Sequence, residues 1–133
     1  MKLHTTDAGF RVAGIMNWKG RIQSPGEPVS TPVSALDFLP TFCDLAKAKV
    51  PADLVLDGTN FLPALKGKQI ARKKPLVWAY YNAINEARVA MRHGKWKVLA
   101  KLNGGKLSKM PNVTRENLHA IQAATLTDIA LYD

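Results

Sequence analysis

Residues 87–100 read Ala-Arg-Val-Ala-Met-Arg-His-Gly-Lys-Trp-Lys-Val-Leu-Ala, and this stretch decides the fold of the second half of the chain. Residues 87–92 alternate polar and apolar side chains, His93 and Gly94 supply turn chemistry, and residues 95–100 alternate back. Alternation with a period of two is typical of a strand with one buried face. The stretch therefore predicts an antiparallel hairpin.

Further strand and helix signals lie outside this hairpin. Residues 75–81 (Pro-Leu-Val-Trp-Ala-Tyr-Tyr) are rich in β-branched and aromatic side chains and predict another strand. Residues 12–18 are apolar on both faces, which is typical of a central strand covered by helices on each side, and its partners would have to come from residues outside this chain. After the turn at residues 103–105, Thr114 is predicted to open a helix that continues to Thr125.

A helix is also predicted in the middle of the chain. Ser34 with Asp37 three residues on is an N-terminal capping pattern, and apolar residues then recur at helical spacing as far as Ala46. Pro40 does not suit a helix that begins at Ala35, because proline lacks an N–H group and clashes with the carbonyl four residues earlier. Either Asp37 is the cap and Pro40 lies in the first turn, or the helix is kinked at Pro40.

Composition limits the functions to consider. The 133 residues, 47% hydrophobic and 22% charged, suffice for one ordinary core without disulfides. The formal charge of +9 would suit a polyanionic partner, but a solvated surface, or an acidic remainder of a longer protein, explains it more simply. The basic run at residues 68–74 lacks the interleaved aromatic residues of a nucleic-acid surface, and no apolar run is long enough to cross a bilayer. Neither a nucleic acid nor a membrane is therefore expected as a partner.

Residues 2–11 (Lys-Leu-His-Thr-Thr-Asp-Ala-Gly-Phe-Arg) place cations, an imidazole, two hydroxyls, a carboxylate and a glycine in one short segment, here called the lysine loop. The segment resembles a part of the sulfatase family in which a lysine precedes a hydroxyl-rich run, an acidic-Gly-Gly-x-Arg turn and a strand ending in Trp-Pro-Gly. Ala8 and Lys19 depart from that pattern, and both occupy turn positions.

Four more segments resemble the same family in collinear order. Residues 33–41 are similar to its Val-Ser-x-x-Asp-x-x-Pro-Thr helix, residues 57–67 to its Asp-Gly-x-Ser/Asn-Leu-x-Pro-x-Leu-x-Gly element, residues 90–99 to its Ala-Val-Arg-x-Gly-x-Trp-Lys-Leu-Ile hairpin, and residues 131–133 to its Leu-Tyr-Asp strand.

The resemblance implies an α/β fold: the C-terminal part of an alkaline-phosphatase-like sulfatase fold, ending in a small antiparallel sheet packed by a helix. Residues 1–67 would be the tail end of the catalytic domain, and residues 68–133 a small C-terminal subdomain. In the hairpin, Trp96 would be a core anchor and Lys97 a cation on the sheet face, remote from the chemistry.

The resemblance also implies a role for Lys2, because the matching lysine of the family lies against the sulfate group. A fixed ammonium stabilises the charge that gathers on the sulfate oxygens as the S–O bond breaks, so Lys2 is the predicted catalytic residue. His4, two residues further on, is the predicted substrate-binding residue. Arg11 is expected to tie the turn to the sheet.

Family membership further implies a formylglycine nucleophile, made from a Cys/Ser-x-Pro-x-Arg motif, and a calcium ion held by carboxylates. Cys43, the one cysteine, is followed by Leu45 and Lys47 where Pro and Arg are required, and its apolar neighbours predict a buried thiol. Ser30 fits no better, because Ser34 stands in the Arg position.

The aspartates are too scattered to predict a calcium site: Asp7, Asp37, Asp44, Asp53 and Asp57. We therefore expect no metal site and no cofactor in this chain, with calcium and formylglycine supplied by a full-length parent. The chain alone is predicted to be inactive.

Two functions from different classes follow. In the first, the chain is the C-terminal portion of a periplasmic or secreted sulfatase whose full-length form hydrolyses a sulfated small molecule or polysaccharide. In the second, it is a free-standing basic α+β module that binds polyanions without catalysis. A Cys/Ser-x-Pro-x-Arg motif in the preceding coding sequence would favour the first.

Overall fold

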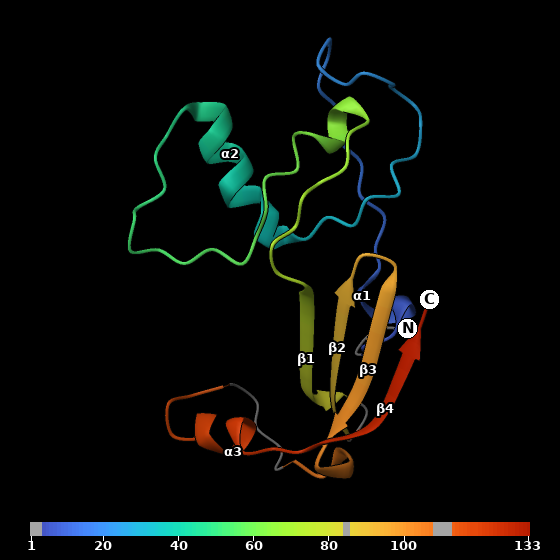
Figure 1. Cartoon of the computed structure of the whole chain (residues 1–133), viewed down its shortest axis with the longest axis vertical. Coiled ribbons are helices and arrows are strands. Elements are labelled where there is room, and N and C mark those ends of the chain that lie inside the picture. Colours follow the sequence, from blue (N-terminus) through green and yellow to red (C-terminus); the bar gives the residue numbers. More distant parts are fainter. Residues whose placement is uncertain (1–3, 84–85, 108–112) are drawn as a thin grey trace. The chain divides into compact units, whose positions relative to one another are not determined.

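In the computed structural model, which describes residues 4–83, 86–107 and 113–133, the chain forms two compact units (Figure 1). The sheet unit combines Met1–Gly14 with Pro75–Asp133, and the helix unit consists of Ile15–Lys74. These units are defined by contacts within the chain and not by the domain boundaries of a family. The division at residue 67 was inferred from family resemblance, and it stays a prediction.

The sheet unit contains one four-stranded antiparallel sheet with the strand order β1-β2-β3-β4. The strands are β1 (Leu76–Ala83), β2 (Glu86–His93), β3 (Trp96–Leu102) and β4 (Leu126–Tyr132). The predicted hairpin is confirmed, since β2 pairs with β3 and His93 lies opposite Trp96 across the turn. Gly94 in that turn has a φ of 60°, a left-handed conformation that glycine adopts without steric cost. The strand predicted at residues 75–81 is confirmed as β1.

The strand register assigns side chains to the two faces of the sheet. Residues opposite each other in paired strands share a face, so Trp78, Ala90 and Leu99 lie on one face, together with Arg92 and Lys97. The short helix α1 (Asp7–Phe10) contributes the Phe10 ring to this face, where it stacks on Trp78.

The opposite face of the sheet carries an apolar row, one residue from each strand. Val77 lies opposite Met91, Met91 opposite Val98, and Val98 opposite Leu131. Val77 is 59% exposed and Leu131 is 62% exposed. The two ends of this row are therefore uncovered by the described residues, whereas Ala100, on the same face, is buried.

Helix α3 (Leu118–Gln122) is shorter than the helix predicted from Thr114 to Thr125. The Thr114 N–H donates to the Asn117 side chain at 2.8 Å, which forms a turn ahead of the helix. At the other end, the Thr125 N–H donates to Oδ1 of Asn103 and the Thr125 carbonyl accepts from the Asn103 N–H. Because these bonds engage the backbone of Thr125, the helix ends before it.

The helix unit begins its regular structure with the 3₁₀ turn η1 (Ala35–Asp37), which leads into α2 (Phe38–Ala46). The capping box is confirmed: Oγ of Ser34 accepts from the Leu36 N–H at 3.3 Å, and the Asp37 carboxylate accepts from the Ser34 N–H at 2.7 Å. Pro40 lies in the first turn of α2, so the first of the two predicted alternatives holds. A second 3₁₀ turn, η2 (Ala64–Lys66), follows in the same unit.

The central strand predicted at residues 12–18 does not form in the described residues. These residues have no regular secondary structure, and Val12 and Ile15 are 82% and 98% exposed. A strand is held by hydrogen bonds to a neighbouring strand. All strands of the described residues belong to the β1–β4 sheet, which leaves this apolar segment without such a neighbour there.

The described part of the chain also contains no helix that is both long and apolar enough to traverse a bilayer.

Candidate functional site

The lysine loop folds back on itself at Gly9. A Cβ atom at this position would lie 2.0 Å from the carbonyl oxygen of His4, far inside van der Waals contact, so only glycine fits. The Gly9 N–H donates to the Thr6 carbonyl at 2.8 Å, and Thr5 is only 3% exposed. Residues 4–9 therefore form a tight, partly buried fold. Lys2 lies outside the described residues.

His4 occupies the part of the loop closest to Lys2 in sequence. Its Nε2 atom is buried and has no hydrogen-bond partner among the described residues. A buried polar atom without a partner costs free energy, so the ring has unused capacity to donate or accept one hydrogen bond. The predicted role of His4 in substrate binding stays a prediction.

Two contacts dock α1 onto one face of the sheet. The Asp7 carboxylate forms a salt bridge with the Lys97 ammonium of β3. The Phe10 ring stacks on Trp78 of β1, with ring centroids 4.1 Å apart and planes 11° apart. The Lys97 ammonium also lies 5.6 Å from the centroid of the Phe10 ring, within reach of a cation–π interaction.

The charge on Asp7 is stabilised by its surroundings. The hydrogen bond from Lys97 lowers the pKa of the Asp7 carboxyl, against a smaller opposing effect of burial, and the positive charges of Lys97, Arg11 and Arg92 lower it further. Asp7 is therefore ionised at neutral pH and can hold the Lys97 ammonium. The Arg11 side chain is exposed and makes no ion pair among the described residues, so Asp7 and Phe10 connect the turn to the sheet in its place.

The expectation that Trp96 is a core anchor is wrong. Trp96 is 46% exposed at the start of β3, where the Lys95 ammonium lies 4.5 Å from its ring centroid, and Trp78 takes the aromatic packing position instead. Lys97 is on the sheet face as predicted, and its ammonium contacts Asp7 of the lysine loop. Its expected separation from the chemistry stays a prediction, because Lys2 lies outside the described residues. Asp7 and Lys97 are 90 residues apart, so no local pattern could have indicated this pair.

A second polar cluster is centred on Asp37 in the helix unit. Asp37 is fully buried, and its carboxylate accepts from the Thr59 N–H at 2.7 Å and from both terminal nitrogens of Arg72 at 2.9 and 2.7 Å. Burial alone would raise the pKa of Asp37, but the hydrogen bonds from Arg72, Ser34 and Thr59, with the charge of Arg72, together lower it. Asp37 thus stays ionised.

Thr41 extends this cluster. Its hydroxyl donates to the Asp37 carbonyl at 2.6 Å and accepts from the Phe61 N–H at 3.1 Å. Gly58 approaches η1 so closely that a Cβ atom there would lie 1.9 Å from the Leu36 carbonyl oxygen. The segments at residues 33–41 and 57–67, both noted for their resemblance to sulfatases, are therefore bound directly to each other.

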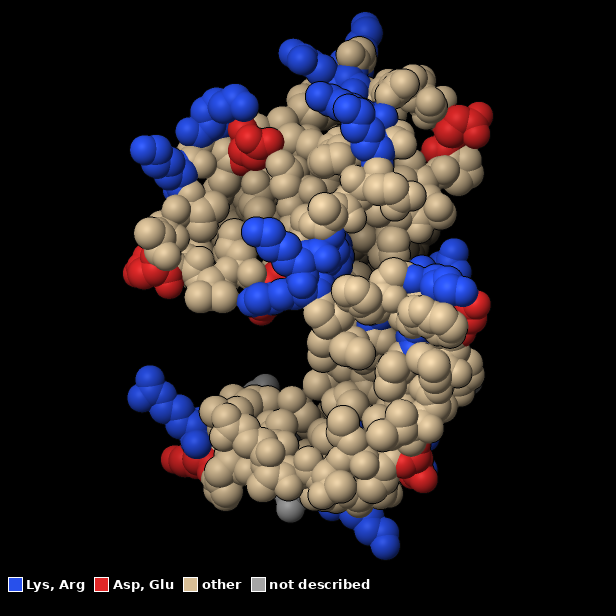
Figure 2. Space-filling view, viewed as in Figure 1, with Lys and Arg blue, Asp and Glu red and all other residues tan. Residues whose placement is uncertain are grey.

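The basic run at residues 68–74 is partly neutralised by carboxylates. Arg72 binds the buried Asp37, and the Lys74 ammonium lies 2.6 Å from Oδ1 of Asp57. Figure 2 shows Lys and Arg side chains in several separate groups on the visible face, with Asp and Glu near many of them.

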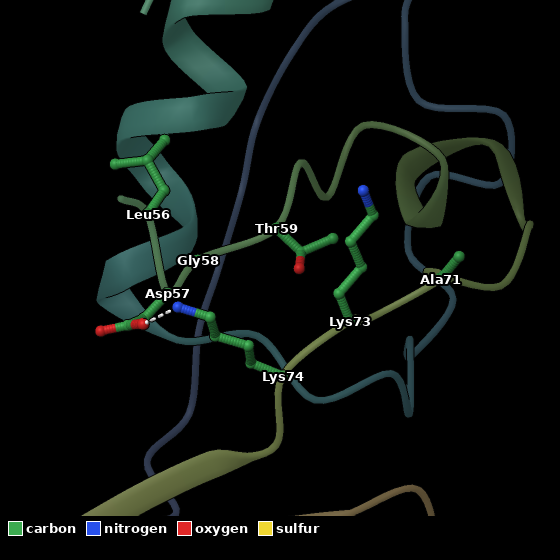
Figure 3. Close-up of a pocket in the computed structure, with 7 residues that line it drawn as sticks. All are labelled: Leu56, Asp57, Gly58, Thr59, Ala71, Lys73 and Lys74. Carbon is green, nitrogen blue, oxygen red and sulfur yellow. Dashed lines mark hydrogen bonds and ion pairs between the residues drawn. The ribbon is translucent and has the colours of Figure 1, made fainter. Parts of the chain in front are cut away.

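A hollow of about 280 Å³ lies beside this run in the helix unit (Figure 3). Its lining residues are Leu56, Asp57, Gly58, Thr59, Ala71, Lys73 and Lys74. Lys74 points to Asp57, whereas the Lys73 side chain extends past Thr59 and makes no ion pair among the described residues. Two ammonium groups and one carboxylate leave the hollow with one net positive charge, enough to attract a small anion.

The carboxylates do not fit a calcium site. Within the ranges that the structure describes, no three or more His, Cys, Asp or Glu side chains lie close enough to hold a metal ion. Asp7, Asp37 and Asp57 are each paired with a cation, and Asp44 accepts from the Asn60 amide at 2.9 Å.

Comparison with known proteins identifies the family. A family profile described as N-sulphoglucosamine sulphohydrolase, C-terminal, matches residues 2–103. The steryl-sulfatase of Rattus norvegicus is 35% identical over 99 residues, which cover 72% of this chain and 17% of that protein. The uncharacterised sulfatase YdeN of Escherichia coli K12 is 40% identical over 78 residues, covering 58% of this chain and 14% of that protein. The ulvan-active sulfatase of Formosa agariphila is 35% identical over 69 residues, covering 52% and 13% respectively.

The matched range begins at Lys2 and includes α1, the Asp37 cluster and the β2–β3 hairpin. The chain belongs to the sulfatase family, in the group described as N-sulphoglucosamine sulphohydrolase, C-terminal. The small four-stranded antiparallel sheet with its helices fits such a domain. The chain spans less than one fifth of the length of the relatives described above.

Proposed function

We propose that this chain is the C-terminal portion of a sulfuric ester hydrolase and that it contributes Lys2 to the site that binds the sulfate group. The parent fold is of the alkaline-phosphatase type. The nucleophile, a formylglycine, and the calcium ion come from residues outside this chain, in a periplasmic or secreted protein. When bound, the calcium ion would supply positive charge beside the sulfate. The chain's own contribution is the ammonium of Lys2, which stabilises charge on the sulfate oxygens in the transition state.

The observation that carries this proposal is the match of residues 2–103 to a sulfatase C-terminal family, beginning at Lys2 itself. The described part of the lysine loop supports it, because residues 4–10 are held against the sheet by the Asp7–Lys97 and Phe10–Trp78 contacts. The buried Nε2 of His4, two residues from Lys2 in the sequence, has no hydrogen-bond partner among the described residues and so keeps one hydrogen bond unused.

The substrate class is a sulfate ester of a small molecule or of a polysaccharide. The relatives include proteins named for both kinds, a steryl-sulfatase and an ulvan-active sulfatase. Both kinds of substrate present the same sulfate group to Lys2, so the first test needs only a small aryl sulfate.

The test is Lys2→Ala in the complete polypeptide that contains this segment. We expect kcat to fall roughly a hundredfold or more, equivalent to about 3 kcal/mol, with a smaller change in KM, because the ammonium's attraction grows as charge builds on the sulfate oxygens. Lys2→Arg should restore activity only in part, since a planar guanidinium directs its donors differently.

The matched control is Lys95→Ala. Lys95 is 63% exposed and its ion pair with Asp133 is equally open to solvent, so its removal should leave kcat nearly unchanged. An unchanged kcat in Lys2→Ala, or equal losses in Lys2→Ala and Lys95→Ala, would remove Lys2 from the site.

A second candidate function is polyanion binding without catalysis, which the hollow around Lys73 and the net charge of +9 favour. Binding of a sulfated polysaccharide to the chain, abolished by Lys73→Ala and by moderate salt, would support it. If the complete polypeptide hydrolyses sulfate esters and depends on Lys2, this alternative is excluded as the main function.

A further inference from the structure

We propose that Lys97 is a positioning residue for catalysis: its salt bridge to Asp7, together with the Phe10–Trp78 stack, clamps the lysine loop to the sheet and so holds Lys2 in place. The inference rests on the proposed function of Lys2. It gives Lys97, on strand β3, a role in the reaction, although the sequence alone placed this residue away from the chemistry.

Lys97 makes two contacts with the same short helix, α1. Its ammonium pairs with Asp7 and also lies 5.6 Å from the centroid of the Phe10 ring. Asp7 and Phe10 are the first and last residues of α1. One lysine therefore contacts both ends of the helix, while Trp78 stacks on its Phe10 end.

The Asp7–Lys97 salt bridge is sheltered from water. The Lys97 side chain is 16% exposed and the Asp7 side chain 44%, whereas the side chains of Lys95 and Asp133 are 63% and 61% exposed. Screening weakens ion pairs in proportion to their exposure, and fully exposed pairs contribute little. The Asp7–Lys97 pair therefore has the stronger hold, and the Lys95–Asp133 pair is a natural control, since Lys95 directly precedes the strand that carries Lys97.

Only a few residues of the sequence separate the clamp from Lys2. Thr5 is 3% exposed, and Gly9 touches the backbone of His4, so the loop is fixed as far as His4. Lys2 precedes His4 by two residues in the sequence, so the loop that the clamp holds leads directly to it. Displacing the loop by only about 1 Å is enough to cost on the order of a hundredfold in rate.

The experiment uses the complete sulfatase polypeptide and a small aryl sulfate. We expect Lys97→Met and Asp7→Asn each to lower kcat roughly ten- to a hundredfold with a smaller change in KM, because they misplace a group that acts in the transition state. The charge swap Asp7→Lys with Lys97→Asp should recover part of the loss. Lys95→Met should have no effect on kcat.

A double-mutant cycle separates positioning from a general structural effect. In the Lys2→Ala background, Lys97→Met should cost at most about twofold, since the group that the clamp positions is already gone. An undiminished loss in that background would overturn the proposal. So would an unchanged kcat in both Lys97→Met and Asp7→Asn.

A second measurement does not depend on activity. Hydrogen exchange in a peptide covering residues 5–11 should become at least tenfold faster in Lys97→Met, while a peptide covering residues 59–62 in the helix unit should be unchanged. Equal protection of residues 5–11 in the wild type and Lys97→Met would show that there is no clamp. If Lys2→Ala is fully active while Lys97→Met loosens the loop, the clamp exists but the proposed function of Lys2 fails, and with it this role in catalysis.

Discussion

Replacing Arg72 by methionine should destabilise the helix unit strongly. Asp37 is 0% exposed and the Arg72 side chain 14% exposed, and two charge-assisted hydrogen bonds join them. Removing one partner of a buried pair leaves an uncompensated charge, which typically costs about 3–5 kcal/mol. The Ser34 and Thr59 N–H groups would still donate to Asp37, so we expect the lower end, about 3 kcal/mol.

Hydrogen exchange of residues 57–62 is the most direct assay. The Thr59 N–H donates to Asp37 and the Phe61 N–H to Thr41, so both amides report on this cluster. A loss of about 3 kcal/mol corresponds to roughly 150-fold faster exchange, because each 1.4 kcal/mol is a factor of ten. If the free energy of unfolding of the helix unit is smaller than about 3 kcal/mol, these amides should exchange at the rate of an unfolded chain.

Lys95→Met serves as the matched control, since it removes one long cation from an exposed ion pair. We expect a loss of at most about 1 kcal/mol. Residues 57–62 should keep their protection in this variant. Equal protection of residues 57–62 in Arg72→Met and Lys95→Met would refute the conclusion that a buried charge pair holds the unit together.

Three further results are expected. Because the pKa of Asp37 is lowered in the folded chain, its contribution to stability should be complete above its unfolded pKa near 3.8 and lost as the pH falls through the lower folded value. Arg72→Met removes the Arg72 hydrogen bonds and charge that lower this pKa, so the loss of unfolding free energy on acidification, followed by circular dichroism, should be smaller in that variant. Gly58→Ala should lower the free energy of unfolding by about 1–3 kcal/mol through its clash with the Leu36 carbonyl, whereas Gly14→Ala, which meets no atom within 4 Å, should be nearly neutral in the same denaturation assay. The isolated chain should not turn over an aryl sulfate even with added calcium, since one cation cannot replace a nucleophile; turnover that survives Lys2→Ala would contradict this expectation. Its exposed apolar segment at residues 12–18 should bind a hydrophobic dye, and cooperative melting without dye binding would contradict that.

The sequence by itself determined the elements whose signals lie within a few residues. Alternation over residues 87–100 predicted the hairpin, and the Ser34–Asp37 spacing predicted the capping box, because strand pairing across a tight turn and helix capping both depend on neighbours in the chain. The collinear motifs likewise placed the chain in the sulfatase family, since each is a short local pattern.

Tertiary structure decided which distant groups meet. Arg72 reads as part of a basic linker but binds Asp37, 35 residues away, and Lys97 reads as a surface cation but binds Asp7. Such pairs depend on how loops close and how strands register, and no local pattern records either. The same reason explains why the strand predicted at residues 12–18 is missing from the described fold: their composition suits a buried strand, but a strand forms only where a neighbouring strand offers hydrogen bonds, and the described fold offers none there.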